Sequence, residues 1–260
     1  MKPGDDLAAF LNRKQPNHHW LIEPLISTDS GRYGLVGGRP DIGKSNLLLN
    51  MGFCLATGTP FLGMKTRRVK VGYYSLELME AELKPRLQKL LKAYPEPQPD
   101  MLHIDCWEPM PLSKHEEEFA AAVRGRDVVI VDPIKYMVSG NYIEPRRATD
   151  FASMMLRLMR QESFVAVMGI QVIKENPKYS LEPGDLFKLK GAGDYVESAT
   201  FALLVEKSPR KHKPGGFGWD KSNPDAKTIH FAKQAEADRR LEPIDTIYDY
   251  ENCKFDIVKP

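Results

Sequence analysis

Cysteine is scarce in this chain of 260 residues, and Cys54, Cys106 and Cys253 lie far apart without any C-x-x-C spacing. Three widely separated cysteines argue against a disulfide framework and a zinc site, and they favour a reducing compartment. The segment Met1–Asp6 also lacks an apolar stretch of the signal-peptide type. We therefore expect a cytoplasmic protein with neither a disulfide nor a zinc ion.

A strong charge imbalance is missing as well, because 37 Lys and Arg face 35 Asp and Glu, for a formal net charge of +2. Any affinity for nucleic acid must then come from a local basic surface. Residues 45–64 carry no charge, but Asn50 and Gly58-Thr59-Pro60 interrupt or end the apolar run. A run of this kind predicts a buried core helix and no membrane span.

Strand and helix patterns alternate along most of the chain. Buried strands are expected at 33–36, 68–76, 102–107, 127–132 and 164–170. Helices are expected at 46–54, 80–94, 116–123 and 150–160, the last capped by Thr149 after a loop over 133–148. This alternation predicts an α/β fold with a mostly parallel twisted sheet flanked by helices.

Beyond residue 190 the pattern changes to strands without full helices between them, at 200–205, 227–232, 244–250 and 254–258. An antiparallel extension of the sheet is the simplest interpretation. We find no internal repeat and no interdomain linker. The predicted organisation is an N-terminal leader over residues 1–30, which could contact another subunit, and one domain over residues 31–260.

The most informative motif lies between the first buried strand and the helix that follows it. It fits the phosphate-loop pattern G-x-x-x-x-G-K-[ST], in which backbone N–H groups and a helix N-terminus bind phosphate. Lys44 is expected to reach the β- and γ-phosphates and Ser45 to ligate Mg²⁺. The alternative is a Gly-rich turn that caps a core helix. The predicted ATP-binding residues are Gly38, Arg39, Pro40, Asp41, Ile42, Gly43, Lys44, Ser45 and Asn46.

One loop residue, Asp41, places a negative charge near the expected phosphates. It is tolerable only if its side chain faces solvent or if Arg39 screens it.

Three polar residues end other strands of the predicted sheet. Asp132 is expected to hold Mg²⁺ beside Ser45, because ligands bind at the carboxyl edge of open α/β sheets. Glu77, on a strand expected to neighbour the phosphate-loop strand, could orient and deprotonate the attacking water, or it could be a first-turn acid of the next helix. Gln171 could sense the γ-phosphate or simply end its strand.

Several segments together resemble RecA-fold P-loop ATPases of the plasmid RepA helicase type, compact relatives of the DnaB hexameric replicative helicases. The resemblance covers residues 18–205 and is carried by Trp20-Leu21-Ile22, Gly37-Gly38-Arg39-Pro40, Pro60-Phe61-Leu62-Gly63, Tyr74-Ser75-Leu76-Glu77 and Val131-Asp132-Pro133. It implies that Glu77 is the catalytic base, Asp132 the Mg²⁺-associated acid and Gln171 the γ-phosphate sensor. Relatives often have His where this chain has Gln171, with a Lys three residues on, which Lys174 keeps.

The resemblance also implies hydrolysis between subunits of a hexameric ring, with a basic residue supplied in trans from a Lys-x-Arg pattern on a late strand. Lys233 matches the Lys, whereas Ala235 occupies the Arg position. Arg239 or Arg240 could substitute, or both could belong to a solvated basic turn.

Single-stranded DNA is the partner that the resemblance implies. Cations interleaved with aromatic residues suit it, since phosphates pair with cations and bases stack on rings. Solvated charged loops are the alternative. The predicted contacts are Lys135, Arg146 and Arg147 in the loop after Asp132, Lys174, Lys188 and Lys190 in the loop after Gln171, and Arg210 and Lys211 in a third segment.

Three functions are thus compatible with the sequence. The first is a ring-forming, Mg²⁺-dependent ATPase of the DNA helicase type that acts in replication on single-stranded DNA. The second is a regulatory or recombination-accessory ATPase that does not unwind DNA. The third is a P-loop phosphotransferase, for which no Arg-rich lid is evident after Glu77. An AAA+ loader is disfavoured because the C-terminal part predicts strands and no helical lid.

Overall fold

The computed structural model describes residues 6–12, 19–28, 31, 33–172, 183–185, 189, 193–208, 212–213, 216–219, 225–235 and 240–258. Within these residues the central feature is a nine-stranded sheet, in the order β13-β12-β11-β8-β3-β7-β6-β4-β5. The sheet is parallel from β5 to β8 and antiparallel beyond it. The predicted α/β fold with an antiparallel C-terminal extension is confirmed.

The parallel strands correspond to the apolar runs of the sequence, and nearly all of their residues are buried apart from those of the edge strand β5. Such continuous burial is typical of parallel strands that are covered on both faces. In spatial order they are β5 (Leu102–Cys106), β4 (Val71–Ser75), β6 (Val128–Asp132), β7 (Val165–Gln171), β3 (Tyr33–Gly38) and β8 (Ala199–Lys207).

The antiparallel strands are β11 (Ala226–Gln234), β12 (Ile244–Asp249) and β13 (Lys254–Ile257). Two short hairpins lie outside the sheet: β1 (Trp20–Ile22) with β2 (Ile26–Ser27), and β9 (His212–Lys213) with β10 (Gly216–Trp219). Leu21, Ile22, Leu25 and Ile26 are buried in the core cluster that contains the helix after β3. Residues 20–27 of the predicted leader therefore pack onto the domain.

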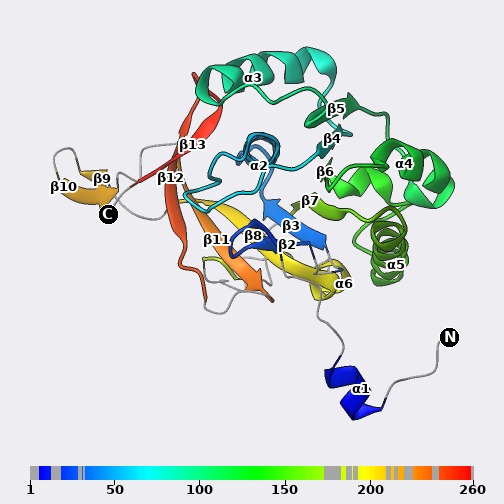
Figure 1. Cartoon of the computed structure of the whole chain (residues 1–260). Coiled ribbons are helices and arrows are strands. Elements are labelled where there is room, and N and C mark those ends of the chain that lie inside the picture. Colours follow the sequence, from blue (N-terminus) through cyan, green and yellow to red (C-terminus); the bar gives the residue numbers. More distant parts are fainter. Residues whose placement is uncertain are drawn as a thin grey trace.

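Helices cover both faces of the sheet (Figure 1). One core cluster joins α2 (Lys44–Thr57) and α3 (Glu80–Ala93) to the sheet, and α3 spans the top of the view from β13 to β5. The opposite cluster contains α4 (Glu116–Val123), α5 (Pro145–Glu162) and α6 (Gly193–Ser198), with the 3-10 turns η1 (Leu112–Lys114) and η2 (Ile134–Met137). The short helix α1 (Leu7–Leu11) lies apart from the sheet.

The start of α5 corrects one prediction. The helix begins at Pro145, five residues before the expected Asp150, and Thr149 is not its cap. Proline suits the first turn of a helix because its missing N–H would have no intrahelical acceptor there. The Thr149 hydroxyl instead donates to the Pro145 carbonyl at 3.0 Å, inside the helix.

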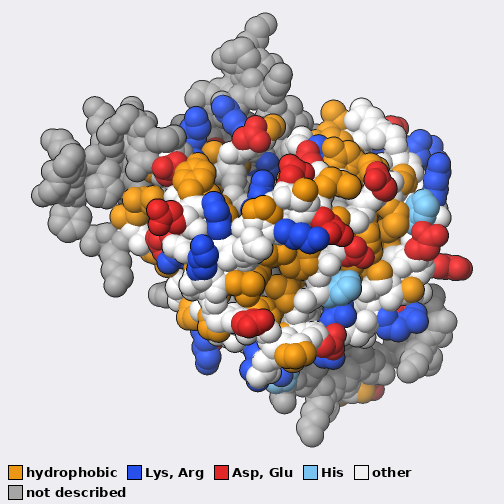
Figure 2. All heavy atoms as spheres, turned by 90° about the horizontal axis from the view of Figure 1, so that it is seen from above, with side chains coloured by type: hydrophobic (Ala, Val, Ile, Leu, Met, Phe, Trp, Pro, Cys, Tyr) orange, Lys and Arg blue, Asp and Glu red, His pale blue; other side chains and the backbone are white. Residues whose placement is uncertain are grey.

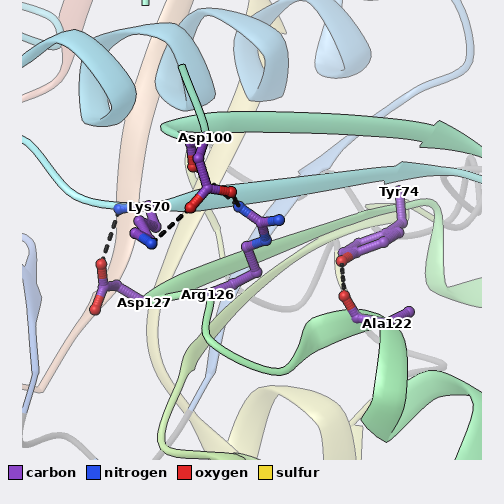
Figure 3. A network of polar contacts seen from close by, with 6 residues as sticks. All are labelled: Lys70, Tyr74, Asp100, Ala122, Arg126 and Asp127. Carbon is purple, nitrogen blue, oxygen red and sulfur yellow. Dashed lines mark hydrogen bonds and ion pairs between the residues drawn. The ribbon is translucent and has the colours of Figure 1, made fainter. Parts of the chain in front are cut away.

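A network of charged side chains joins the amino ends of β4, β5 and β6 (Figure 3). The Asp100 carboxylate accepts hydrogen bonds from Lys70 Nζ at 2.6 Å and from Arg126 Nη1 at 2.9 Å. The Lys70 backbone N–H donates to Asp127 Oδ2 at 2.8 Å. Deeper in the sheet, the Tyr74 hydroxyl donates to the Ala122 carbonyl on α4 at 2.7 Å. The charged contacts stabilise the amino edge, opposite the carboxyl edge at which ligands bind in open α/β sheets.

The uncharged segment after the phosphate loop forms a helix that ends at Thr57, followed by Gly58 with φ 77°. Asn50 does not interrupt this helix. Its side chain is buried, donates to the Cys253 carbonyl at 2.7 Å and accepts from the Tyr94 hydroxyl at 2.9 Å. Asn50 thereby joins α2 to α3 and to the turn before β13. In the described part of the chain, no helix has the length and apolar character to cross a membrane.

Candidate functional site

The phosphate-loop motif forms the turn between β3, which ends at Gly38, and α2, which begins at Lys44. Gly43 precedes the helix with φ 107°, a conformation that favours glycine, and no side chain caps the helix start. The first N–H groups of a helix lack intrahelical acceptors and attract anions. The turn thus presents the donors that a phosphate chain requires.

Some side chains of this turn are exposed, and one charged side chain is buried. Arg39, Pro40 and Asp41 are exposed, so Asp41 meets the condition under which its charge is tolerable. Lys44 is only 8% exposed, and its ammonium donates to the Arg39 carbonyl at 2.7 Å. Burial lowers the pKa of Lys44, and the carboxylates of Asp132 and Glu77 oppose that shift.

Asp132 ends β6 at the same edge and is 3% exposed. The Tyr73 hydroxyl donates to its Oδ2 atom at 2.8 Å from the neighbouring strand β4. Burial raises the pKa of Asp132, whereas hydrogen bonds from Ser45 and Tyr73 and the Lys44 charge lower it. Lys44 and Asp132 are thus buried at one edge of the sheet, and the half-buried Ser45 donates a hydrogen bond to the Asp132 carboxylate there.

Glu77 lies two residues beyond the end of β4, in a turn before α3. The Ser75 hydroxyl holds this turn, since it donates to the Leu78 carbonyl at 2.8 Å and accepts from the Leu78 N–H at 3.0 Å. The expectation that the Glu77 strand neighbours the phosphate-loop strand is wrong, because β6 and β7 lie between β4 and β3. Glu77 nevertheless lies near enough for its charge to raise the pKa of Lys44.

The Glu77 carboxylate is 44% exposed and pairs with Lys135, whose Nζ donates to Oε1 at 2.9 Å. Lys135 belongs to η2, directly after Asp132 and Pro133. No local pattern predicts this pair, because its members lie 58 residues apart and on different elements.

Gln171 ends β7, the strand that pairs directly with β3. Its register partner is Gly38, the first residue of the motif, and the N–H of the next residue, Val172, donates to the Gly38 carbonyl at 3.2 Å. The Gln171 side chain is half-buried. It is thus the strand-end polar residue placed immediately beside the phosphate loop.

Two further residues shape the site although sequence reasoning did not select them. Tyr73 is fully buried against Asp132. Gly169, in β7, leaves room for the same carboxylate, since an added Cβ would meet it. A lone glycine inside a β-branched strand signals a close approach, so Gly169 could have been found from sequence. The two adjacent tyrosines of β4 offer no comparable signal.

The remaining motif residues have ordinary structural partners. Ile42 is buried, and the Asn46 amide oxygen accepts a hydrogen bond from Arg86 Nη1 of α3 at 3.2 Å. Arg86 thus ties α3 to the first turn of α2.

The donor set fits Mg²⁺ and a triphosphate. Mg²⁺ prefers oxygen ligands and is usually held by one or two protein groups together with substrate phosphates. Ser45 and Asp132 supply such oxygens, and Lys44 supplies the cation. Among the described residues, no group of three His, Cys, Asp or Glu side chains could hold a metal ion.

The predicted trans-acting residues lie elsewhere. Lys233 pairs in register with Ala202 of β8, and its ammonium donates to the Val196 carbonyl at 2.7 Å and to that of Glu197 at 3.0 Å. It therefore holds the end of α6 within its own chain. Arg240 is exposed, and Arg239 falls outside the described residues.

The predicted DNA contacts are only partly described. Arg146 and Arg147 are exposed, but they belong to the first turn of α5 and not to a loop, because that helix starts at Pro145. The other five fall outside the described residues: Lys174, Lys188, Lys190, Arg210 and Lys211. The face seen from above in Figure 2 mixes both charge signs with hydrophobic side chains.

Comparison with known proteins agrees with this geometry. The profile of a protein family described as an AAA domain matches residues 1–171, about two thirds of the chain. The chain belongs to this AAA domain family. No curated protein matches the sequence.

Several solved structures are similar to this chain over nearly its whole length. The ATPase domain of G40P is 12% identical with a TM-score of 0.62, and the match covers 88% of this chain and 86% of that one. A DnaB-like replicative helicase, solved to describe its interactions with primase, is 13% identical with a TM-score of 0.62. That match covers 87% of this chain but only 58% of the helicase.

The flagellar accessory protein FlaH from Methanocaldococcus jannaschii is 14% identical with a TM-score of 0.56, over 88% of this chain and 90% of FlaH. At such identities the likeness shows the fold. The predicted RecA-like P-loop ATPase fold, shared with DnaB-like helicase domains, is confirmed.

Proposed function

We propose that this AAA domain is a Mg²⁺-dependent ATPase of the helicase type, which forms a ring and acts in replication on single-stranded DNA. One observation carries the ATPase part. Lys44, Asp132 and Glu77 come from three separate parts of the chain, yet they lie at one edge of the sheet, where the charge of Glu77 acts on both buried groups, Lys44 and Asp132.

Each residue has a distinct role in hydrolysis. Backbone N–H groups of the loop and Lys44 bind the phosphates, and Lys44 offsets the charge that develops on them. When bound, Mg²⁺ neutralises phosphate charge and orients the transferred group. Ser45 and Asp132 would hold it, and Tyr73 keeps the Asp132 carboxylate in place. Glu77 orients a water molecule and accepts its proton.

Gln171 can couple hydrolysis to the rest of the molecule. It stands beside Gly38 at the end of β7. Its amide can hydrogen-bond a phosphate oxygen and lose that bond when the phosphate leaves. In our proposal, this change is passed to residues 172–192, which follow Gln171 and carry Lys174, Lys188 and Lys190 for DNA contact.

A ring would add a basic residue from a neighbouring subunit, for which Lys233, Arg239 and Arg240 are the candidates. Mixing a Lys233→Ala subunit with a Lys44→Ala subunit tests this role, because each then lacks a different half of a shared site. Recovered turnover in the mixture supports catalysis across an interface. A loss that is merely additive counts against Lys233.

The second candidate is an accessory ATPase that does not unwind DNA. The fold that this chain shares with FlaH, named a flagellar accessory protein, supports it. In that case the chain would hydrolyse ATP to change its contacts with a protein partner.

The deciding experiment measures ATP turnover with and without a deoxythymidine oligonucleotide, alongside the mass of the assembly with Mg²⁺–ATP. Turnover that DNA stimulates, in a ring-sized assembly, supports the motor. Turnover without stimulation, in a monomer, supports the accessory ATPase. Absence of turnover under both conditions contradicts both candidates.

A further inference from the structure

The C-terminal hairpin of β12 and β13 packs against the phosphate loop. An added Cβ at Gly43 would lie 3.2 Å from Cζ and 3.9 Å from Cε1 of Phe255, so the tip of this ring lies against the glycine. Phe255 belongs to β13, is 7% exposed and packs on the Tyr248 ring of β12, with centroids 5.0 Å apart. In Figure 1, β13 (red) lies beside α2, the helix that follows the loop. A strand near the end of the chain therefore contacts the residue directly before α2.

Gly43 is the position at which this contact matters most for the shape of the loop. Its φ of 107° favours glycine, and glycine loses more conformational freedom on ordering than any other residue. The Gly43 carbonyl accepts a hydrogen bond from the Leu47 N–H at 2.9 Å, which closes the first turn of α2. The direction of the free N–H groups in that turn thus depends on how firmly Gly43 is fixed.

The hairpin that carries Phe255 is itself bound to both helices of this face. Asn50 of α2 donates to the Cys253 carbonyl at 2.7 Å. Lys89 Nζ of α3 donates to the Tyr250 carbonyl, also at 2.7 Å. These two bonds hold the hairpin against α2 and α3, and so they keep the Phe255 ring on the loop.

We propose that Phe255 is a positioning residue for phosphate binding, whose ring fixes Gly43 so that the phosphate loop is ordered before a nucleotide binds. Without the ring, binding would have to order the loop, which weakens affinity. The family profile matches residues 1–171, so this support comes from a part of the chain outside that match. The inference rests on the proposed binding of nucleotide and specifies what prepares the site for it.

The first test compares two replacements of similar volume. Phe255→Leu loses the ring atoms that reach Gly43, whereas the longer side chain of Phe255→Met can still reach it. In isothermal titration calorimetry, Phe255→Leu should raise the Kd for Mg²⁺–ATP about five- to thirtyfold, which corresponds to ordering one backbone residue on binding. Phe255→Met should bind as the wild type does. Ile257→Ala is the control on the same strand, because the Ile257 side chain lies against Gly63 instead.

The same titration with Mg²⁺–tripolyphosphate separates the loop from the rest of the nucleotide. Tripolyphosphate has neither base nor ribose, so a residue that supports the phosphate loop should affect both ligands by the same factor. A Kd that rises for ATP alone would assign Phe255 to the base or the ribose and overturn the inference. Equal losses in Phe255→Leu and Phe255→Met would mean that the ring only fills the core, and would overturn it as well.

A second test needs neither ligand nor substitution. In the wild type without nucleotide, the Leu47 N–H should already be protected from hydrogen exchange, because its acceptor residue Gly43 is fixed. A Leu47 amide that exchanges freely until nucleotide is added would contradict the inference, and this measurement decides alone if Phe255→Leu does not fold. In Phe255→Leu this amide should exchange about five- to thirtyfold faster, while Leu55, later in α2, keeps its protection.

The outcomes also separate the inference from the proposed function. Wild-type protein that binds neither Mg²⁺–ATP nor tripolyphosphate overturns the proposed function. Wild-type protein that binds ATP, together with a Phe255→Leu variant that binds it equally tightly, overturns only the inference. If the wild type binds ATP but no measurable tripolyphosphate, the hydrogen exchange of Leu47 decides.

Discussion

The Asp132 carboxylate lies so close to Gly169 that a Cβ built at position 169 would stand 2.6 Å from Oδ1. Such a Cβ would also meet Leu48 Cδ1 of α2 at 3.1 Å. Because Gly169 has no side chain, the buried Asp132 carboxylate fits against β7. It faces Ser45 and Lys44 from β6, the strand beside β7.

Gly169→Ala should therefore displace Asp132. We expect a loss of about 1–3 kcal/mol in the free energy of unfolding, as for other overpacked cores. ATP turnover should fall on the order of 100-fold, since a shift of about 1 Å in a positioning group has that effect. Gly52→Ala is the control, because its Cβ would come no nearer than 3.3 Å to another atom, the flexible end of Ile130, and would meet Val71 and Leu102 at ordinary contact distances. Wild-type turnover in Gly169→Ala would contradict the placement of Asp132.

Lys44→Ala should abolish stabilisation by nucleotide. Mg²⁺–ATP at 100 times its Kd should raise the free energy of unfolding of the wild type by about 2.7 kcal/mol. The variant lacks the buried ammonium that meets the phosphates, so thermal melts with and without Mg²⁺–ATP should coincide. The exposed substitution Lys84→Ala should keep the full shift. A melting shift that persists in Lys44→Ala would show that nucleotide binds elsewhere.

Asn50→Leu should destabilise the protein by about 1–3 kcal/mol, because the buried Cys253 carbonyl and the Tyr94 hydroxyl lose a partner. Chemical denaturation measures this change. Gln88→Leu, an exposed amide replaced on α3, should shift stability by no more than about 0.5 kcal/mol. Equal behaviour of the two variants would mean that Asn50 does not join α2, α3 and the C-terminal turn.

The Asp132 carboxyl predicts an unusual pH dependence without nucleotide. Burial raises its pKa above the ordinary 3.8, so in the interval between the two values the folded state binds more protons than the unfolded state. Stability from this group is then present at lower pH and is lost as pH rises through that interval. Relative to Asp132→Asn, the wild type should lose stability from acid toward neutral pH. A difference that stays constant or grows would reverse the assigned direction.

Particular residues show which features of the fold and of the candidate site can be predicted from the sequence alone. The positions of the phosphate loop, Asp132 and Gln171 were predictable because they depend on local pattern: a strand, its end and the turn after it. The start of α5 was missed although Pro145 is a known first-turn signal. Thr149 resembled a cap, but its hydroxyl binds a carbonyl inside the helix.

Local sequence pattern could not predict the order of the strands in the sheet, nor the face of the sheet on which a side chain lies. The sequence around Glu77 does not indicate that β6 and β7 lie between β4, the strand before Glu77, and the phosphate-loop strand β3. Both tyrosines of β4 are buried, Tyr73 in the cluster with α2 and Tyr74 in the opposite one, so a continuous buried run does not reveal which of them meets Asp132. The Lys135–Glu77 pair depends on the same long-range packing.

The role of Glu77 is tested most directly by measuring nucleotide affinity and ATP turnover together in Glu77→Gln. Removal of a general base should lower turnover by about 10²–10⁴-fold, while the Kd for Mg²⁺–ATP stays within about twofold of wild type, because Lys44, Ser45 and Asp132 remain. Undiminished turnover in this variant would contradict the assignment of the base and, with it, the chemistry proposed for this edge of the sheet.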